Sequence, residues 1–147
     1  MKTLVAVLLM SMMGSLPAWA ALGEDVSSVD SDAQALGGQH RLVAKVGYNL
    51  HQITMADGSV VNEFVSPQGK VFGVSWQGSS MPDFQQLLGS YATQLQQGQR
   101  TRVIPRRGIT IQGNDFVFTN FGRMRSFRGR AYVPSLVPSN TTAEVVQ

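Results

Sequence analysis

The chain has 147 residues, carries 12 Lys and Arg against 9 Asp and Glu for a formal net charge of +3 at pH 7, and contains no cysteine. This length fits one domain with a real hydrophobic core. The absence of cysteine excludes disulfides, thiol nucleophiles and cysteine-ligated zinc, so packing and hydrogen bonds must stabilise the fold.

Residues 1–20 have the pattern of a secretory signal peptide. Lys2 precedes the apolar run Leu4–Met13, and Ala18-Trp19-Ala20 has the small-x-small form that signal peptidase cleaves. The apolar run has 10 residues, against the roughly 20 that a membrane-spanning helix needs. We expect cleavage after Ala20, export of the chain, and no transmembrane segment in the mature protein of 147 − 20 = 127 residues.

The segment that follows, residues 21–40, is polar, small and acidic, with Glu24, Asp25, Asp30 and Asp32. Such a composition favours a mostly extended, flexible lead-in, with room for a short helical turn near Ala33–Leu36. We expect a single α+β domain over residues 41–134 and an irregular C-terminal tail over residues 135–147, which holds Pro138, Ser139 and Asn140.

Three strands with two turns between them are predicted in the first half of the domain. Asp-Gly at residues 57–58 and Pro-Gln-Gly at residues 67–69 are turn signals between apolar runs, which predicts an antiparallel meander over residues 42–76. A two-residue loop at Asp57-Gly58 would place Ile53 opposite Asn62, and the next turn would place Glu63 opposite Phe72. Because neither face is cleanly polar, we expect both to be covered at least in part.

One main amphipathic helix is predicted from Pro82 to about Gln97. Ser79 or Ser80 can cap it, Pro82 suits its first turn, and Gly98 ends it. Its apolar stripe is expected to pack on the sheet and consists of Phe84, Leu87, Leu88, Tyr91 and Leu95.

Further strands are predicted over residues 108–112, 114–121 and 124–133. The predicted fold class is therefore α+β: a single domain with an antiparallel β-meander of five to six strands and one main amphipathic helix packed on a face.

Positive charge is concentrated late in the chain. Residues 100–130 contain eight arginines and one acid, Asp115. Such a surface favours an anionic partner, which for an exported protein means an anionic polysaccharide, a lipid headgroup or an acidic protein surface, and not nucleic acid. If this region is a strand, Arg123 and Arg125 share one face and Arg128 and Arg130 the other; a solubilising edge strand is the competing interpretation. Trp76 is either part of the core or a ligand platform.

Glu63 is the notable carboxylate, because the expected register puts it on a packed face. A buried carboxylate must be paired or protonated, so we expect a buried ion pair with one of the late arginines. The alternative is an acid or base in a cleft, which needs a second carboxylate; Asp83 is the candidate.

No other catalytic or metal-binding pattern stands out. Gly73-Val-Ser75-Trp-Gln77 lacks the second glycine of a serine nucleophile elbow. His40 and His51 are the only histidines, and the carboxylates have no ligand spacing, so no catalytic residue, metal or cofactor is assigned.

Two separated blocks resemble a known family. They are Glu63-Phe-Val-Ser-Pro67 with the following Gly69-to-Trp76, Gly78, Pro82-Asp-Phe84, Leu87-Leu-Gly89 and Tyr91, and the late block Met124-Arg-Ser-Phe-Arg-Gly-Arg-Ala-Tyr-Val-Pro134. Together they resemble the bacterial exported domain-of-unknown-function family 2844. The resemblance implies a small secreted or periplasmic protein of a Gram-negative bacterium and implies no activity, cofactor or site residue.

These observations favour a non-enzymatic binding or envelope-associated module that contacts its partner through an arginine-rich C-terminal strand. A small cell-wall or polysaccharide hydrolase using Glu63, or a structural subunit of an envelope assembly, remains the alternative.

Overall fold

The computed structural model describes residues 22–100 and 108–147. The expected signal peptide lies outside these residues. No helix within the described ranges is long and apolar enough to cross a membrane.

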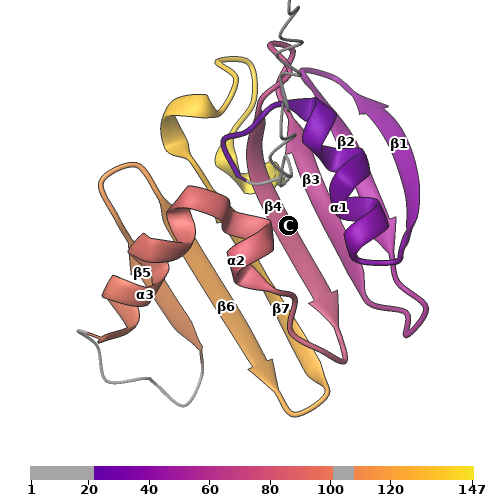
Figure 1. Ribbon diagram of the computed structural model, residues 1–147. Coiled ribbons are helices and arrows are strands. Elements are labelled where there is room, and N and C mark those ends of the chain that lie inside the picture. The colour runs from indigo at the N-terminus through magenta and orange to yellow at the C-terminus, as the bar shows by residue number, and fades with distance from the viewer. Residues whose placement is uncertain (1–21, 101–107) are drawn as a thin grey trace, which may run out of the picture.

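An antiparallel sheet of seven strands forms the body of the protein (Figure 1). Its strands lie in the order β1-β2-β3-β4-β7-β6-β5. Their bounds are β1 Gln39–Lys45, β2 Tyr48–Thr54, β3 Val60–Val65, β4 Val71–Gly78, β5 Ile109–Gln112, β6 Val117–Arg123 and β7 Ser126–Tyr132. The α+β single domain and the antiparallel sheet are confirmed, with at least one strand more than expected.

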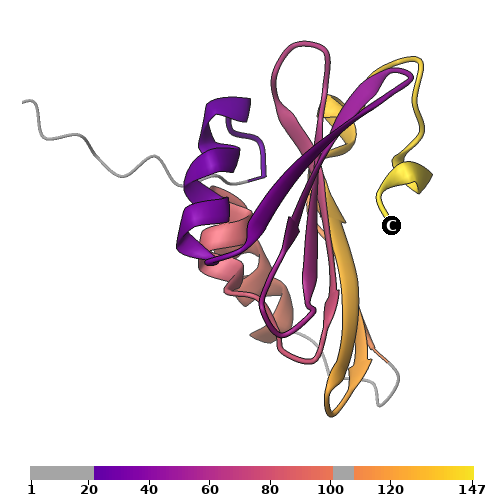
Figure 2. The ribbon, with the colours of Figure 1, turned by 90° about the vertical axis from the view of Figure 1, so that its right-hand side faces the viewer.

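The two faces of the sheet have different covers (Figure 2). Helices α1 (Val29–Ala35), α2 (Phe84–Leu88) and α3 (Ala92–Arg100) lie on one side, which we call the helix face. The C-terminal segment, residues 134–147, lies on the other side, which we call the tail face. This segment contains the short 3-10 helices η3 (Pro134–Leu136) and η4 (Ala143–Val145).

The additional strand is β1, which pairs with β2 through a tight hairpin. Lys45 is opposite Tyr48, so only Val46 and Gly47 form the turn. Gly47 has a φ of 86°, a conformation that glycine adopts without steric cost. This glycine is the signal in the sequence that extends the meander by one strand toward the N-terminus.

The flexible lead-in predicted over residues 21–40 is wrong for the part that the structure describes. Residues 26–35 form the 3-10 turn η1 (Val26–Ser28) and α1, and β1 begins at Gln39. Leu22 and Val29 are buried in the helix-face core. Because the apolar side chains are few and widely spaced, this segment resembles a solvated leader in composition although it packs on the sheet.

The expected strand registers are also wrong. Ile53 lies opposite Val61, and Glu63 lies opposite His51 on one side and Val74 on the other. The first turn closes between Met55 and Ser59, where the Met55 nitrogen donates to the Ser59 oxygen at 2.8 Å and the Gly58 nitrogen donates to the Met55 oxygen at 3.0 Å, so its loop is one residue longer than expected. An irregularity between Phe64 and Val65 shifts the second pairing.

The main helix is present on the expected face but is not continuous. The 3-10 turn η2 (Gly89–Tyr91) separates α2 from α3, and Gly89 has a positive φ of 50°. The expected serine cap is wrong: Asp83 is the N-cap and accepts hydrogen bonds from the main-chain nitrogens of Gln85 and Gln86.

Two hydrophobic cores result from the two covered faces. The larger lies under the helices and contains the Trp76–Phe84–Phe118 aromatic cluster, with ring centroids 5.0–5.5 Å apart. The smaller lies under the C-terminal segment, where Val146 is fully buried beside Phe64 and Phe72. The tail expected to be irregular is therefore partly helical and packs on the sheet.

Candidate functional site: a polar groove on the tail face

The arginine-rich strand β7 is central to the sheet, between β4 and β6, so the edge-strand interpretation is wrong. Arg128 lies opposite Gln77 and Phe121, and Arg130 lies opposite Ser75 and Thr119. Arg128 and Arg130 share one face of the sheet, as expected from their spacing, and this is the tail face.

Arg123 and Arg125 do not share a strand face. Arg123 is the last residue of β6, and Arg125 is in the two-residue turn to β7 with a positive φ of 63°. The turn interrupts the alternation that the sequence pattern assumed. Arg123 lies opposite Ser126, which places it on the tail face near Arg128.

An open groove of about 560 Å³ lies on the tail face beside the C-terminal segment. Its walls come from strands β3 to β7 and from Val146 and Gln147. The side chains on this face that line it are hydroxyls, amides, one aromatic ring and two guanidinium groups: Asn62, Ser75, Gln77, Thr110, Thr119, Phe121, Arg128 and Arg130.

Hydrogen bonds fix the polar floor of the groove across three strands and the tail. Gln52 Nε2 donates to Asn62 Oδ1 at 3.2 Å, and Asn62 Nδ2 donates to Ser75 Oγ at 3.3 Å. Ser75 Oγ in turn donates to the main-chain oxygen of Gln147 at 2.6 Å. The polar side chains of the floor are therefore held in fixed orientations by these hydrogen bonds in the absence of a ligand.

The two groove arginines differ in their freedom. Arg130 Nη1 donates to the main-chain oxygen of Val146 at 3.2 Å, and its guanidinium lies 5.9 Å from the Tyr132 ring centre. Arg128 is exposed and also borders the adjoining hollow with Arg125 and Gly58. Arg130 is therefore a positioned donor, whereas Arg128 can move to meet a ligand.

Positive charge in the groove is not neutralised by neighbouring acids. No Asp or Glu side chain lines the groove, and no described Asp or Glu lies within salt-bridge distance of Arg123, Arg125, Arg128 or Arg130. These cations are available to an external anion.

Trp76 contributes to the floor of the groove, but its ring belongs to the core on the opposite face. The ring packs on Phe84 and Phe118, and its Nε1 donates to Asn120 Oδ1 at 3.1 Å. Trp76 is 3 % exposed, so it supports the groove from below and offers no ring for stacking.

Glu63 is buried, as expected, but its partner is Asp32 of α1 and not an arginine, so the expected ion pair is wrong. Each of the two carboxyl side chains belongs to a residue only 1 % exposed. No nitrogen or hydroxyl of the described residues donates to either Glu63 oxygen, whereas Gln86 Nε2 donates to Asp32 Oδ1 at 3.0 Å. A proton between the two carboxyls supplies the remaining hydrogen bond.

The environment of Glu63 strongly favours its protonated form. Burial, the negative charge of Asp32 and the hydrogen bond to Asp32 together raise the pKa of Glu63 to about 9. The pair joins α1 to the helix face, remote from the groove. A hydrolase that uses Glu63 would need this carboxyl to reach a substrate, and in this structure the helices cover it.

The two histidines lie at the same junction. His40 Nε2 and His51 Nδ1 are 2.9 Å apart, and His40 Nδ1 lies 3.2 Å from Asp30 Oδ1. Burial, followed by the charge of His40, lowers the pKa of His51, and Asp30 opposes this shift. Within residues 22–100 and 108–147, no group of three or more His, Asp or Glu is arranged to hold a metal ion.

Sequence reasoning missed the polar members of the groove, above all Asn62, Ser75 and Thr119. Their alternation with apolar residues on each strand was a usable signal of one shared face. Their assembly depends on β7 pairing with β4, a contact between strands that are far apart in the sequence.

The family described as "Protein of unknown function (DUF2844)" matches residues 18–146. The chain belongs to the DUF2844 family. Comparison with curated proteins and with solved structures found no match. The expected family membership is thereby confirmed, and the description of DUF2844 assigns no function, so the function of this member must be argued from its own groove.

Proposed function

We propose that this DUF2844 protein is an exported, non-enzymatic binding module that holds a segment of acidic polysaccharide in the groove of the tail face. The observation that carries the proposal is the groove lining: Arg128 and Arg130 stand among hydroxyl and amide side chains, with no Asp or Glu side chain among them. Export is supported by the signal-peptide pattern of residues 1–20.

The groove chemistry suits an acidic sugar better than the other anionic partners. Amide and hydroxyl groups such as those of Asn62 and Thr119 pair with sugar hydroxyls, whereas Arg128 and Arg130 pair with carboxylate or sulfate groups. Phe121, 44 % exposed at the rim, offers a flat apolar surface for a sugar ring.

A binding role also fits the chemical inventory of the groove. General acid–base chemistry needs a His, Asp, Glu, Lys, Tyr or Cys within hydrogen-bond reach of the substrate. The residues that line the groove include none of these types. Its arginines hold and orient an anion and do not exchange protons at neutral pH.

The proposal is tested by binding of the mature protein to a polyuronate, with neutral dextran as the reference polymer. We expect binding to the polyuronate that weakens as salt rises, and no binding to dextran. Arg128→Ala together with Arg130→Ala is expected to remove at least nine-tenths of the affinity.

Arg41→Ala is the matched control, because Arg41 is an exposed arginine on the same face of the sheet but on the edge strand β1. It should leave the affinity unchanged. Equal losses in the control and the groove variant would contradict the groove, and a protein that binds neither polymer at low salt would contradict the substrate class.

A further inference from the structure

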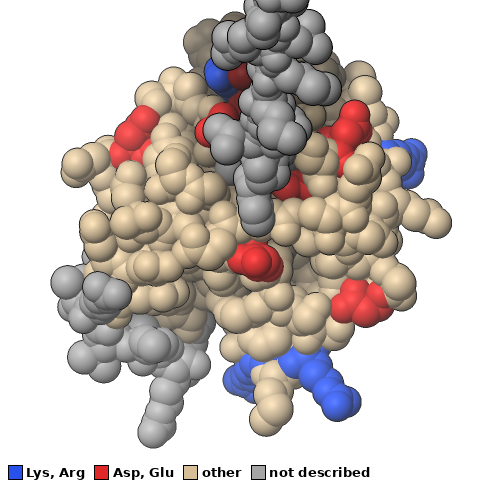
Figure 3. All heavy atoms as spheres, viewed as in Figure 1, with Lys and Arg blue, Asp and Glu red and all other residues tan. Residues whose placement is uncertain are grey.

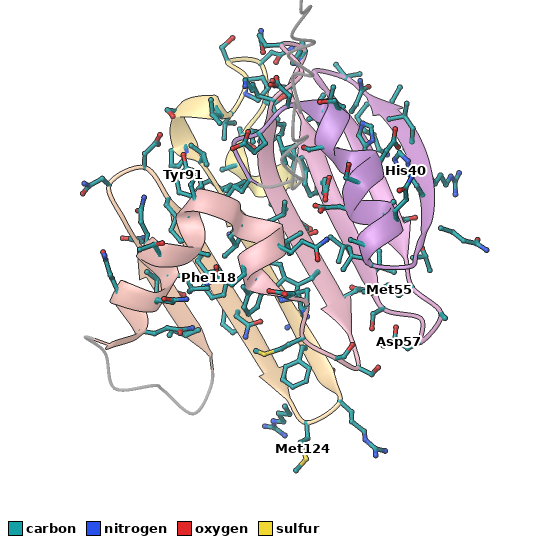
Figure 4. The ribbon with its side chains drawn as sticks, in the orientation of Figure 1. His40, Met55, Asp57, Tyr91, Phe118 and Met124 are labelled. Carbon is teal, nitrogen blue, oxygen red and sulfur yellow. The ribbon has the colours of Figure 1, made fainter. Side chains whose placement is uncertain are left out.

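A second surface, separate from the groove, lies at the end of the β6–β7 hairpin. Its turn consists of Met124 and Arg125, since Arg123 pairs with Ser126. We call Arg123, Met124 and Arg125 the basic tip. Figure 4 shows Met124 at the outer end of the hairpin, pointing away from the body of the protein.

Met124 is a large apolar side chain at the end of a hairpin and is 93 % exposed. Arg123 and Arg125 on either side of it are exposed as well. Turn geometry does not require an apolar residue at this position, because two-residue hairpin turns favour Asn, Asp and Gly. The 93 % exposed side chain of Met124 is therefore available to contact a partner.

Other apolar side chains are exposed at the same end of the sheet. Phe121, on β6, is 44 % exposed, and Met81, in the loop that follows β4, is 48 % exposed. The end of β4 is adjacent to the basic tip, because Gly78 pairs with Phe127. The apolar groups and the arginines thus occupy one end of the molecule.

Charge is distributed unevenly around this end. Figure 3 shows Lys and Arg side chains at the lower end of the helix face and most Asp and Glu side chains over its middle and upper parts. Asp57, labelled in Figure 4 in the same orientation, lies to one side of this lower end. No described carboxylate forms a salt bridge with Arg123 or Arg125. In Figure 4 Met124 at the basic tip projects beyond Asp57, so a negatively charged planar surface that approaches along the hairpin meets the arginines of the tip first.

We propose that the basic tip docks on the surface of an anionic lipid bilayer, with the Met124 side chain inserted below the headgroups and Arg123 and Arg125 bound to lipid phosphates. An apolar side chain flanked by guanidinium groups matches the layered chemistry of a membrane interface, apolar below and anionic above. A hydrated acidic polysaccharide would engage the arginines and leave Met124 without a role. This binding is additional to the groove, and neither depends on the other.

The test is co-sedimentation of the mature protein with vesicles of phosphatidylglycerol and phosphatidylcholine in equal amounts, against vesicles of phosphatidylcholine alone. We expect binding to the anionic vesicles only. Arg123→Gln with Arg125→Asn should weaken it about 25-fold, at about fivefold for each charge removed near the surface. Asparagine is chosen at position 125 because it tolerates the positive φ of that residue.

Met124→Gln separates the lipid from other anions, because it keeps every charge. It should weaken vesicle binding severalfold and leave polyuronate binding unchanged. Arg130→Ala is the converse control and should affect polyuronate binding alone. Far-ultraviolet circular dichroism of each variant confirms that the fold is intact.

Equal binding to both kinds of vesicle would overturn the proposal, as would full vesicle binding by Met124→Gln. Loss of polyuronate binding in the tip variants would assign the tip to the polysaccharide instead. Failure of vesicle binding alone leaves the groove proposal standing, because the groove is tested by Arg128→Ala with Arg130→Ala against the polyuronate.

Discussion

Asp32 and Glu63 meet where the N-terminal helix rests on the sheet, and one proton between them is required. Two adjacent buried carboxyl groups cannot both ionise at low cost. Because the shared proton is lost at high pH, the attachment of α1 to the sheet is sensitive to alkali. The pH dependence of the free energy of unfolding therefore reports on this pair.

Stability of the protein is predicted to fall as the pH rises from about 5 to 9. The pKa of Glu63 is about 9 in the folded state against an ordinary value of 4.5, so its contribution is complete below 4.5 and is lost as the pH rises toward 9. Glu63→Gln lacks this titration. Urea unfolding at pH 5, 7 and 9 should therefore show the variant gaining relative to wild type at each step.

A constant difference between the two proteins across these three pH values would contradict the shared proton. The comparison with the variant also removes the opposing effect of His51, whose lowered pKa makes its own contribution rise as the pH increases through 6.5.

Gly73 is a second residue with a specific role, because it makes room for Val146. A Cβ atom at this position would lie 2.5 Å from Val146 Cγ2. Gly73→Ala is predicted to displace the C-terminal segment and to lower the free energy of unfolding by about 1–3 kcal/mol. The cost should shrink in a Val146→Ala background, and a double-mutant cycle with chemical denaturation measures this coupling. Additive effects would show that the two sites are independent.

For single residues, the sequence correctly predicted which side chains are buried, but it did not predict which side chains they contact. Glu63 and Trp76 were recognised as residues of a packed face, because alternation along a strand is a local property. The partner of Glu63 was missed because Asp32 looks like one of several solvated acids in a polar segment. Only the packing of α1 selects this one for burial.

At the scale of elements, the N-cap of the helix that begins at residue 84 differs from the one predicted from the sequence. The hydroxyls of Ser79 and Ser80 donate to Asp57 at 3.1 Å, and Asp83 caps the helix. Three residues before the helix could all act as caps, and sequence alone does not rank them.

Asp83→Ala is predicted to lower the free energy of unfolding by about 1 kcal/mol, the usual cost of losing an N-cap. Ser80→Ala is the control and should change it by less than about 0.5 kcal/mol, as for an exposed position. Thermal or urea unfolding compares the three proteins. A larger effect in the serine variant would return the cap to the expected position.

Strands β2, β3 and β4 were predicted from their turns, but their registers were not. A turn signal such as Asp57-Gly58 fixes where the chain reverses only to within a residue, and one residue moves every side chain to the other face. The interruption of the main helix at Gly89 was likewise hidden, since the apolar stripe continues through it.

At the scale of the whole molecule, side chains near both ends of the described chain are buried against the sheet, one on each face. Leu22 lies in the helix-face core and Val146 in the tail-face core. We predict a single cooperative unfolding transition, because neither core can be exposed without removing the cover of the shared sheet.

Fluorescence and circular dichroism provide the measurement. The sequence contains two tryptophans, and Trp76 is the one that remains after the expected cleavage. Its fluorescence should report the helix-face core with the same urea midpoint as the circular dichroism of the sheet. Two separated midpoints would show that the layers unfold independently.

The fold class could be predicted from the sequence, whereas the groove could not. Local turns indicate an antiparallel sheet, but the groove exists only because β7 joins β4, more than 40 residues earlier in the chain. The arginines were found by composition, and their use depends on that long-range contact.

The position of β7 between β4 and β6 also fixes the order in which the sheet can be completed. A chain that emerges with its N-terminus first can form the β1–β4 meander, but β4 then presents unpaired main-chain groups along one side. The main-chain groups along this edge of β4 remain unpaired until β7, which ends at Tyr132, is available, because β7 and not β5 or β6 pairs with β4. During this interval the half-built sheet can join another copy edge to edge. For an exported chain, staying unfolded until synthesis and transport are complete removes that hazard.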